Sequence, residues 1–236
     1  MKSWIGAGLV AAAALMGGAG YADEKPLVLI ELFTSQGCNS CPPADALLAE
    51  LAVRDDVLPL ALHVDYWDYI GWKDKFARPE HTARQKAYAH VAGASTIYTP
   101  QMVVGGTDHV VGYKPMRVAD YMKAHEATLA DVEVRAEIVD GKMRIKCLVK
   151  DGTTLPTKIN VDIVRFNPSE TVDIKHGENA GETIAYTNIV TDWERVATWD
   201  GRETLELDTA MAGDGPMALI LQEPGPGRVL AAYRIN

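Results

Sequence analysis

The hydrophobic pattern of this chain changes its period near residue 130, and this change most constrains the fold. Before it, apolar runs at 27–33 and 57–64 flank apolar residues spaced i, i+3, i+4 and i+7 over 44–51. That order of strand, helix and strand predicts a right-handed crossover and a parallel pair of strands. After residue 130, apolar residues alternate with polar ones, as they do in half-buried strands.

The first part continues with further helices and strands. A helix is predicted from about Pro79 to Val91, and another from Pro115 to about Leu129, with proline at the favoured first position. Two short strands at 101–104 and 109–112 are joined by a glycine-rich loop that fits a hairpin. Basic residues between 73 and 86 alternate with acidic ones, so we interpret them as a solvated helix face.

The second part is predicted to be an antiparallel β-sandwich, because short strands follow one another without a helical pattern. The strand-like runs are 132–138, 143–147, 158–166, 171–175, 182–187, 204–207, 217–221 and 228–235. Polar or aromatic stretches at 176–179 and 193–200 are interpreted as loops, and Asp140-Gly141 as a hairpin turn. We therefore expect an α/β domain at 26–129 and a β-rich C-terminal domain at 130–236.

The first 22 residues have the pattern of a secretory signal peptide. Lys2 supplies a positive charge, Ile5 to Met16 is apolar, and small residues precede a cleavage point near Ala22. The apolar run is shorter than the ~20 residues that span a bilayer, so an uncleaved anchor is the less favoured alternative. We expect a periplasmic or secreted protein without a membrane segment after cleavage.

Charge and cysteine content exclude several functional classes. The chain has 23 Lys+Arg against 32 Asp+Glu, and a net charge of -9 argues against nucleic-acid binding. Three cysteines are too few for a disulfide scaffold. In an oxidising compartment, a close cysteine pair indicates redox chemistry more readily than a metal clip. No cofactor is implied by the sequence.

The most informative motif is Cys38-Asn39-Ser40-Cys41, between the first strand and a helix that starts around Pro42-Pro43. A thiolate at a helix N-terminus faces unpaired N–H groups and the positive end of the helix dipole. These lower its pKa from about 8.5 toward ~3.5–7.5. Cys38 is therefore the expected nucleophile, and Cys41 is placed to resolve a mixed disulfide. Because half of a zinc site looks the same, the motif needs a second feature.

That second feature is Thr99-Pro100, directly before the strand at 101–104. Proline is disfavoured inside sheets, so its position indicates a special turn and a candidate cis peptide bond. The order strand, CxxC, helix, strand, insertion, Thr-Pro, hairpin and helix resembles the thioredoxin superfamily over roughly 26–129. Cys38, Cys41 and Pro100 match its redox motif and its cis-proline.

The sequence around these motifs resembles a narrower family. Residues 31–45, 63–74 and 98–102 are similar to a secreted bacterial thioredoxin-like family known only as a domain of unknown function. The resemblance extends over most of the mature chain and names no substrate. The wider resemblance to thioredoxins implies that Pro100 lies against the cysteine pair and that the backbone of Thr99 binds an extended substrate chain.

Together these features predict a thiol–disulfide oxidoreductase that acts on protein thiols or disulfides and exchanges electrons with a redox partner protein. Asn39-Ser40 is neither the Gly-Pro of typical reducing thioredoxins nor the Pro-His of oxidising periplasmic enzymes, so the direction of electron flow stays open. Glu31 is a candidate proton shuttle for Cys41. The alternative for Glu31 is a partly exposed acid at a strand end.

Two other functions compete with this prediction. One is copper binding or delivery by Cys38 and Cys41 with His63, since thiolates and imidazole select Cu(I) or zinc. The structural alternative for His63 is a hydrogen-bonded pair with Asp65. The other function is that of a non-enzymatic binding protein with a permanent structural disulfide.

Two further features receive structural interpretations. Cys147 shares a strand face with apolar residues, so we expect a buried and inert thiol. The aromatic insertion at 66–72 is interpreted as packing, with an exposed platform for substrate proteins as the alternative.

Overall fold

The structure is a computed structural model that describes residues 25–139, 142–210 and 215–235. The predicted signal peptide at 1–22 and the predicted turn at Asp140-Gly141 lie outside these residues. Helices and strands alternate in the first part and strands follow one another in the second.

The first part holds the three α-helices of the described chain. Its elements are β1 (Val28–Thr34), α1 (Pro42–Ala52), β2 (Val57–His63), the 3-10 helix η1 (Asp68–Ile70), α2 (Pro79–Val91), β3 (Gln101–Val104), β4 (Asp108–Val111) and α3 (Pro115–Glu126). Each α-helix starts with proline, which fits the first helical position because no hydrogen-bond donor is lost there. The predicted starts of these helices are therefore confirmed.

The second part consists of strands within the described residues. They are β5 (Val132–Val139), β6 (Lys142–Val149), β7 (Ile159–Asp173), β8 (Thr183–Trp199), β9 (Leu205–Ala210), β10 (Met217–Gln222) and β11 (Val229–Ile235). Two of them are much longer than the sequence pattern predicts. The runs expected at 158–166 and 171–175 form the single strand β7, and 193–199, expected to be a loop, belongs to β8. Bulges between these two strands shift their register and interrupt the alternation that marks a strand.

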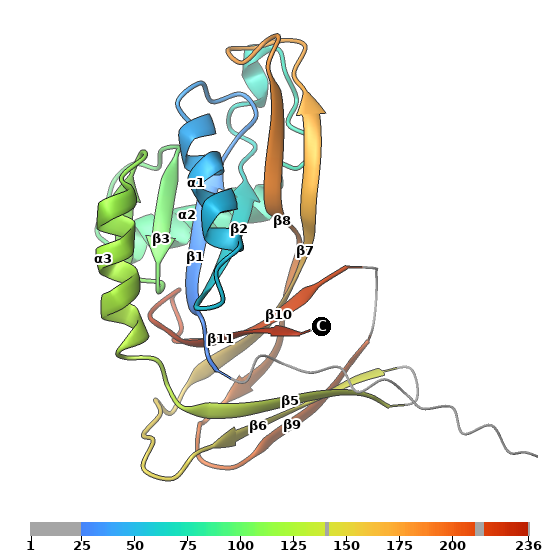
Figure 1. Ribbon diagram of the computed structural model, residues 1–236. Coiled ribbons are helices and arrows are strands. Elements are labelled where there is room, and N and C mark those ends of the chain that lie inside the picture. Colours follow the sequence, from blue (N-terminus) through green and yellow to red (C-terminus); the bar gives the residue numbers. More distant parts are fainter. Residues whose placement is uncertain (1–24, 140–141, 211–214, 236) are drawn as a thin grey trace, which may run out of the picture.

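Strands from both parts form one large sheet. Its order is β11-β10-β7-β8-β2-β1-β3-β4, and β5-β6-β9 form a separate three-stranded sheet (Figure 1). The predicted parallel pair is confirmed, because β1 and β2 pair in parallel from Val28 with Val57 to Thr34 with His63. Strand β8 meets β2 at the pair Ala61 and Ile189. The boundary expected at 129/130 therefore does not divide this sheet, and the protein is a mixed α/β protein dominated by a large β-sheet.

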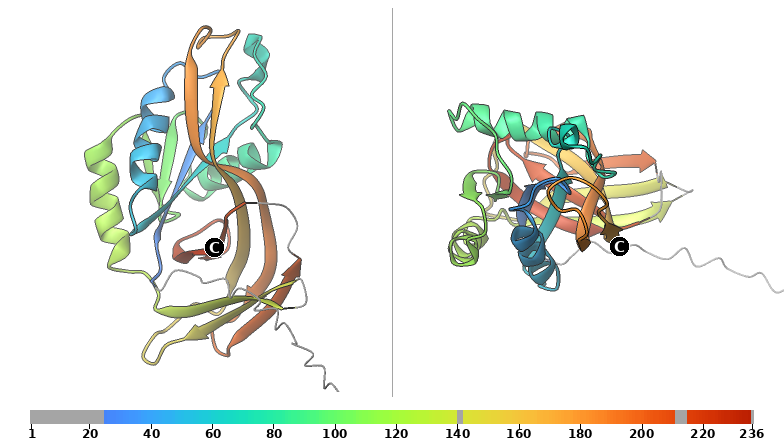
Figure 2. Two further views of the ribbon diagram at one scale, coloured as in Figure 1. Left: turned by 45° about the vertical axis from the view of Figure 1, so that its right-hand side comes forward. Right: turned by 90° about the horizontal axis from the view of Figure 1, so that it is seen from above.

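The helices lie on both faces of the sheet. Figure 2 shows α1 and α3 on one face and α2 on the other. Strand β1 is buried on both sides, with Ile30 and Leu32 packed in the core that contains α1 and α3. Leu29 and Phe33 pack in the opposite core, which includes Tyr88 of α2. Alternate residues of β1 therefore face different helices. A side chain of β1 can reach α1 only if it lies on the same face as Ile30 and Leu32.

The three-stranded sheet packs against the end of the large sheet formed by β7, β10 and β11. The shared core includes Ile145, Trp199 and Tyr233. Cys147 lies within this core with no exposed surface, and burial raises the pKa of its thiol to about 12. The prediction of a buried third cysteine is confirmed. The second part does not form the expected sandwich by itself, because β7, β8, β10 and β11 belong to the large sheet with β1 to β4.

Candidate functional site

The two cysteines of the CxxC motif form a disulfide between β1 and α1. The Cα atoms of Cys38 and Cys41 are 5.4 Å apart, within the usual range for a disulfide. Cys41 is the N-cap residue of α1, and its carbonyl oxygen accepts hydrogen bonds from the N–H groups of Ala44 and Asp45 at 2.8 and 3.1 Å. The start of the helix therefore fixes the position of Cys41 relative to the sheet.

The helix N-terminus offers fewer hydrogen-bond donors to a thiolate than a typical helix start does. The first two helical residues, Pro42 and Pro43, carry no N–H group. The N–H of Cys41 is bonded to the carbonyl of Cys38 at 3.2 Å. The Ser40 hydroxyl lies 3.5 Å from the Cys38 sulfur. A Cys38 thiolate would therefore depend on the helix dipole and on this hydroxyl more than on free N–H groups of α1.

The cis-proline loop lies at the same end of the sheet as the disulfide. The Thr99-Pro100 peptide bond is cis, as expected. Continuing the antiparallel register of β1 and β3 places Pro100 opposite Thr34, at the end of β1 that leads to the cysteines. The Trp67 indole N–H donates a hydrogen bond to the Thr99 hydroxyl at 2.7 Å, and a Cβ on Gly37 would lie 3.2 Å from the Cβ of Trp67. Trp67 therefore connects the cis-proline loop to the loop at 35–41 that carries the cysteines, called the cysteine loop below.

A buried polar cluster lies between α1 and the sheet, one helical turn from Cys41. Thr34 and His63 are partners in the register of β1 and β2, and neither side chain is exposed. Asp45 of α1 is 4% exposed and close enough to His63 and Thr34 for both to stabilise its charge. Burial outweighs that stabilisation and raises the pKa of Asp45 to about 7. This carboxyl can therefore gain or lose a proton near neutral pH.

His63 is held by a second buried acid, which is not the one predicted. Its Nδ1 lies 2.7 Å from an oxygen of Asp74, and that carboxylate also accepts a hydrogen bond from the Gln36 N–H at 2.8 Å. Burial opposes the charge of Asp74, but His63 and the hydrogen bonds prevail and keep its pKa below the ordinary value. The predicted partner Asp65 instead accepts a hydrogen bond from the Thr82 hydroxyl at 2.6 Å. The expected pair of His63 with Asp65 is therefore wrong.

Some atoms of this cluster have unused hydrogen-bonding capacity. Within the described chain, His63 Nε2 and Asp45 Oδ2 are buried and make no hydrogen bond. Buried polar atoms rarely stay unpaired, because losing water without a new partner costs free energy. Unpaired atoms next to a titrating carboxyl fit a site where protons or water molecules enter and leave.

Glu31 lies on the opposite face of the sheet from α1. It is not exposed, and it forms a bidentate ion pair with Arg84 of α2. The guanidinium nitrogens of Arg84 donate to the two carboxylate oxygens of Glu31 at 2.5 and 2.9 Å. The Tyr88 hydroxyl also donates a hydrogen bond to Glu31. The structure therefore brings together Cys38, Cys41 and the Thr99-Pro100 loop, but gives Glu31 partners on the α2 side. The solvated helix face expected between 73 and 86 is also wrong at Arg84, which points into the protein.

The turn between β7 and β8, at 174–182, covers the disulfide, a role that the sequence does not predict. Neither Cys38 nor Cys41 has exposed surface. Asn179 of this turn is 7% exposed and donates hydrogen bonds to the carbonyls of Gln36 and Cys38 at 2.9 and 3.0 Å. The indole N–H of Trp72 in the aromatic insertion binds the Gln36 side chain at 2.8 Å. The only sequence signal for this role was a polar turn without a recognised pattern.

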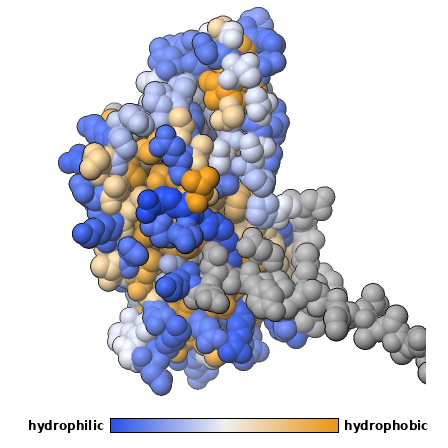
Figure 3. Space-filling view, viewed as in Figure 1, coloured by the Kyte–Doolittle hydropathy of each residue, from blue (hydrophilic) through white to orange (hydrophobic). Residues whose placement is uncertain are grey.

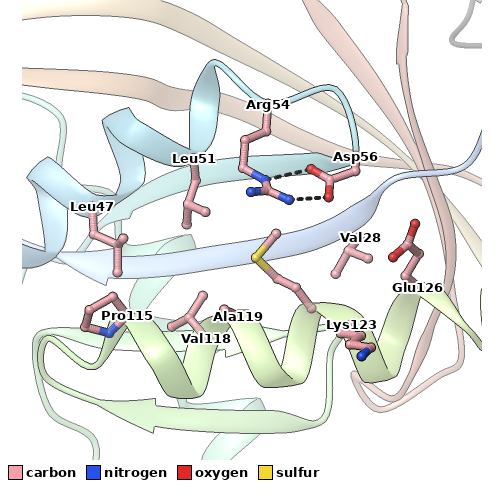
Figure 4. A pocket seen from close by; sticks show the side chains of 11 residues that line it. Val28, Leu47, Leu51, Arg54, Asp56, Pro115, Val118, Ala119, Lys123 and Glu126 are labelled. Carbon is pink, nitrogen blue, oxygen red and sulfur yellow. Dashed lines mark hydrogen bonds and ion pairs between the residues drawn. The ribbon is translucent and has the colours of Figure 1, made fainter.

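The metal alternative lacks a ligand set in the described residues, where no group of three His, Cys, Asp or Glu side chains is arranged to hold an ion. A small cavity of about 140 Å³ lies between α1 and α3, away from the disulfide (Figure 4). Leu47, Leu51 and Val118 line it, and Arg54 is paired with Asp56 at its edge. We assign it no chemistry. No helix in the described part of the chain is long and apolar enough to cross a membrane.

The fold and the site define an α/β protein with a buried disulfide at a strand–helix junction, next to a cis-proline loop and a buried acid. The chain belongs to the family "Protein of unknown function (DUF1223)", whose model matches residues 29–221. Protein AGR_C_4864 from Agrobacterium tumefaciens has a similar structure, with a TM-score of 0.76 and 32% sequence identity over 88% of this chain and 93% of that one. HBP35 of Porphyromonas gingivalis shares the fold, with a TM-score of 0.56, 16% identity and coverage of 89% and 74%. Comparison with curated proteins gave no match.

Proposed function

We propose that this protein is a thioredoxin-like thiol–disulfide oxidoreductase that exchanges electrons with protein thiols or disulfides through Cys38 and Cys41. The observation that carries the proposal is the position of their disulfide. It closes the loop before α1, beside the cis Thr99-Pro100 bond and one helical turn from an acid whose pKa is about 7. A disulfide that only stabilised the fold would not require this titrating group.

The proposed reaction is reversible thiol–disulfide exchange. In the reducing direction, the Cys38 thiolate attacks a partner disulfide, forming a mixed disulfide and releasing one partner thiolate, which takes up a proton. Cys41 then loses its proton and attacks the Cys38 sulfur. The Cys38–Cys41 bond forms as the bond to the partner breaks, so two electrons pass to the partner. No cofactor is required, and the reverse steps oxidise a partner dithiol.

Asp45 is the proposed proton acceptor for Cys41 in place of Glu31. It lies one helical turn after Cys41 on a buried part of α1, whereas Glu31 is bound to Arg84 on the other face of the sheet. A base is most effective when its pKa lies near the working pH, and the pKa of Asp45 is about 7. His63 stabilises the Asp45 carboxylate that remains after proton release to solvent.

The cis-proline loop is the proposed binding site for the partner chain. Thr99 is oriented by Trp67, and its backbone precedes Pro100 at the end of the sheet that carries the cysteines. Recognition through backbone hydrogen bonds tolerates different partner sequences. The protein is proposed to act in the periplasm or outside the cell, which cleavage near Ala22 in a periplasmic or culture fraction would test.

The deciding experiment is measurement of the reduction potential of the disulfide against glutathione buffers. We expect a value above about -300 mV, where physiological reductants can reduce it. A lower value would identify a permanent structural disulfide and refute the proposal. In parallel, Cys41→Ser should trap a mixed disulfide of Cys38 with a partner protein, and Cys38→Ser serves as the control that should trap none.

A further inference from the structure

The turn between β7 and β8 lies over the cysteine loop. Both long strands extend to the end of the molecule where α1 begins, so the turn is beside the loop that carries the disulfide (Figures 1 and 2). On the face seen in Figure 3, a small apolar area among hydrophilic side chains marks this end of the protein. Because Cys38 and Cys41 have no exposed surface, an attacking thiolate cannot reach either sulfur in this arrangement.

The turn is a compact unit with its own hydrogen bonds. The N–H of Ile174 binds the carbonyl of Glu182 at 2.9 Å, and the N–H of Gly181 binds the carbonyl of Ile174 at 2.8 Å. Gly177 adopts a positive φ of 81°, and a Cβ there would lie 3.3 Å from side-chain atoms of both Ile70 and Trp72. The turn therefore keeps its shape through its own hydrogen bonds and packs closely on the aromatic insertion.

Asn179 provides the two hydrogen bonds from this turn to the cysteine loop. Its amide nitrogen donates to the carbonyls of Gln36 and Cys38, which lie 143 and 141 residues away in the sequence. These bonds hold the turn to the backbone of the reacting residue itself. Moving the turn off the disulfide requires that both bonds break.

We propose that Asn179 is a specificity-determining residue that latches the β7–β8 turn over the disulfide, so that only a partner able to displace the turn reaches Cys38. This inference rests on the proposed function for its biological meaning. The latch itself concerns access to a sulfur atom, so it can be tested with any reductant. A partner protein would gain access to Cys38 by binding the turn or the aromatic insertion beneath it. A thiol that binds neither would not reach the disulfide while the turn is closed.

The test compares the rate at which dithiothreitol reduces the disulfide in the wild-type protein and in Asn179→Ala. In this reaction, dithiothreitol is oxidised to its cyclic disulfide as Cys38 and Cys41 become thiols, and mass spectrometry after alkylation follows the two thiols formed. We expect the variant to react about thirtyfold faster, the equivalent of about 2 kcal/mol for two hydrogen bonds. Asn179→Asp, which keeps the size but loses the donors, should react at least as fast as Asn179→Ala.

The matched control is Glu178→Ala, an exposed neighbour in the same turn, which should react at the wild-type rate. Rates of both Asn179 variants within about twofold of wild type would overturn the latch. If the variants do not fold, the wild-type protein still decides the question. Its reduction rate should level off at high dithiothreitol concentration, because opening of the turn then limits the reaction.

A wild-type rate that stays proportional to dithiothreitol concentration and equals that of an unstructured Cys-Asn-Ser-Cys peptide would also overturn the latch. Failure of the proposed function has a different signature. A reduction potential below about -300 mV would remove the redox role and leave the comparison of reduction rates unaffected.

Discussion

Asp45 offers the most quantitative prediction, because its burial makes stability depend on pH. The pKa of this carboxyl is about 7 in the folded protein and close to its ordinary value of 3.8 in the unfolded chain. Between these values the folded state holds a proton that the unfolded state has released, so stability falls as pH rises. A difference of about 3 pKa units corresponds to about 4 kcal/mol, fully expressed above pH 7.

Replacing Asp45 with asparagine removes this penalty, because an amide of the same shape stays neutral at every pH. We expect Asp45→Asn to be as stable as wild type near pH 4 and more stable by up to about 4 kcal/mol at pH 8.5. Urea unfolding of the oxidised proteins over this pH range measures the difference. Comparing the two proteins at each pH cancels the contributions of the titrating groups that do not interact with Asp45.

An exposed aspartate close to the end of the same helix provides the control. Asp55→Asn changes the net charge by the same amount but should alter stability by no more than about 0.5 kcal/mol at any pH. A gain for Asp45→Asn that did not increase between pH 4 and 8.5 would refute the reasoning. It would mean that Asp45 is hydrated in solution. Burial would then not raise its pKa, and the reason for proposing it as the proton acceptor would be removed.

Three further predictions concern residues around the site. Arg84→Met leaves Glu31 buried without a cation and should lower the free energy of unfolding by about 3–5 kcal/mol in urea titrations; an unchanged midpoint would contradict the buried ion pair. Cys147, whose pKa is raised to about 12 by burial, should resist iodoacetamide in the native protein and react only after unfolding, as mass spectrometry can show. Trp67→Phe removes the hydrogen bond to Thr99 and should raise the KM for a protein partner by about fivefold with little change in kcat, whereas a matching fall in kcat would argue against a binding role.

The sequence predicted the first part of the fold well because its signals are local. Helices that begin at Pro42, Pro79 and Pro115 carry their start signal within a single turn. The parallel pair β1 and β2 follows from two apolar runs separated by one amphipathic helix. Thr99-Pro100 was identified for a similar reason, since a proline at the start of a strand needs an explanation at that position alone.

The acid near the cysteines could not be identified in the same way. Strand β1 is apolar on both faces, as is typical of a strand covered by helices on each side, so the sequence does not reveal which face α1 covers. Glu31 and Thr34 differ by three positions and therefore face opposite sides. Thr34 faces α1 and Glu31 faces α2, where Arg84 neutralises it. The number of residues between Glu31 and Cys38 does not reveal which face of the sheet Glu31 occupies.

The long hairpin of β7 and β8 explains why the site draws on both parts of the chain. Strand β8 joins the sheet at Ala61 of β2, and its Tyr186 packs against His63 with ring centroids 4.8 Å apart. The same hairpin carries Asn179 to the cysteine loop. One element therefore helps to bury the polar cluster and also covers the disulfide. Without it, water would reach Asp45, and the burial that raises the pKa of this carboxyl would be lost. It follows that residues 26–129 alone carry the cysteines but lack the surroundings that tune and shield them.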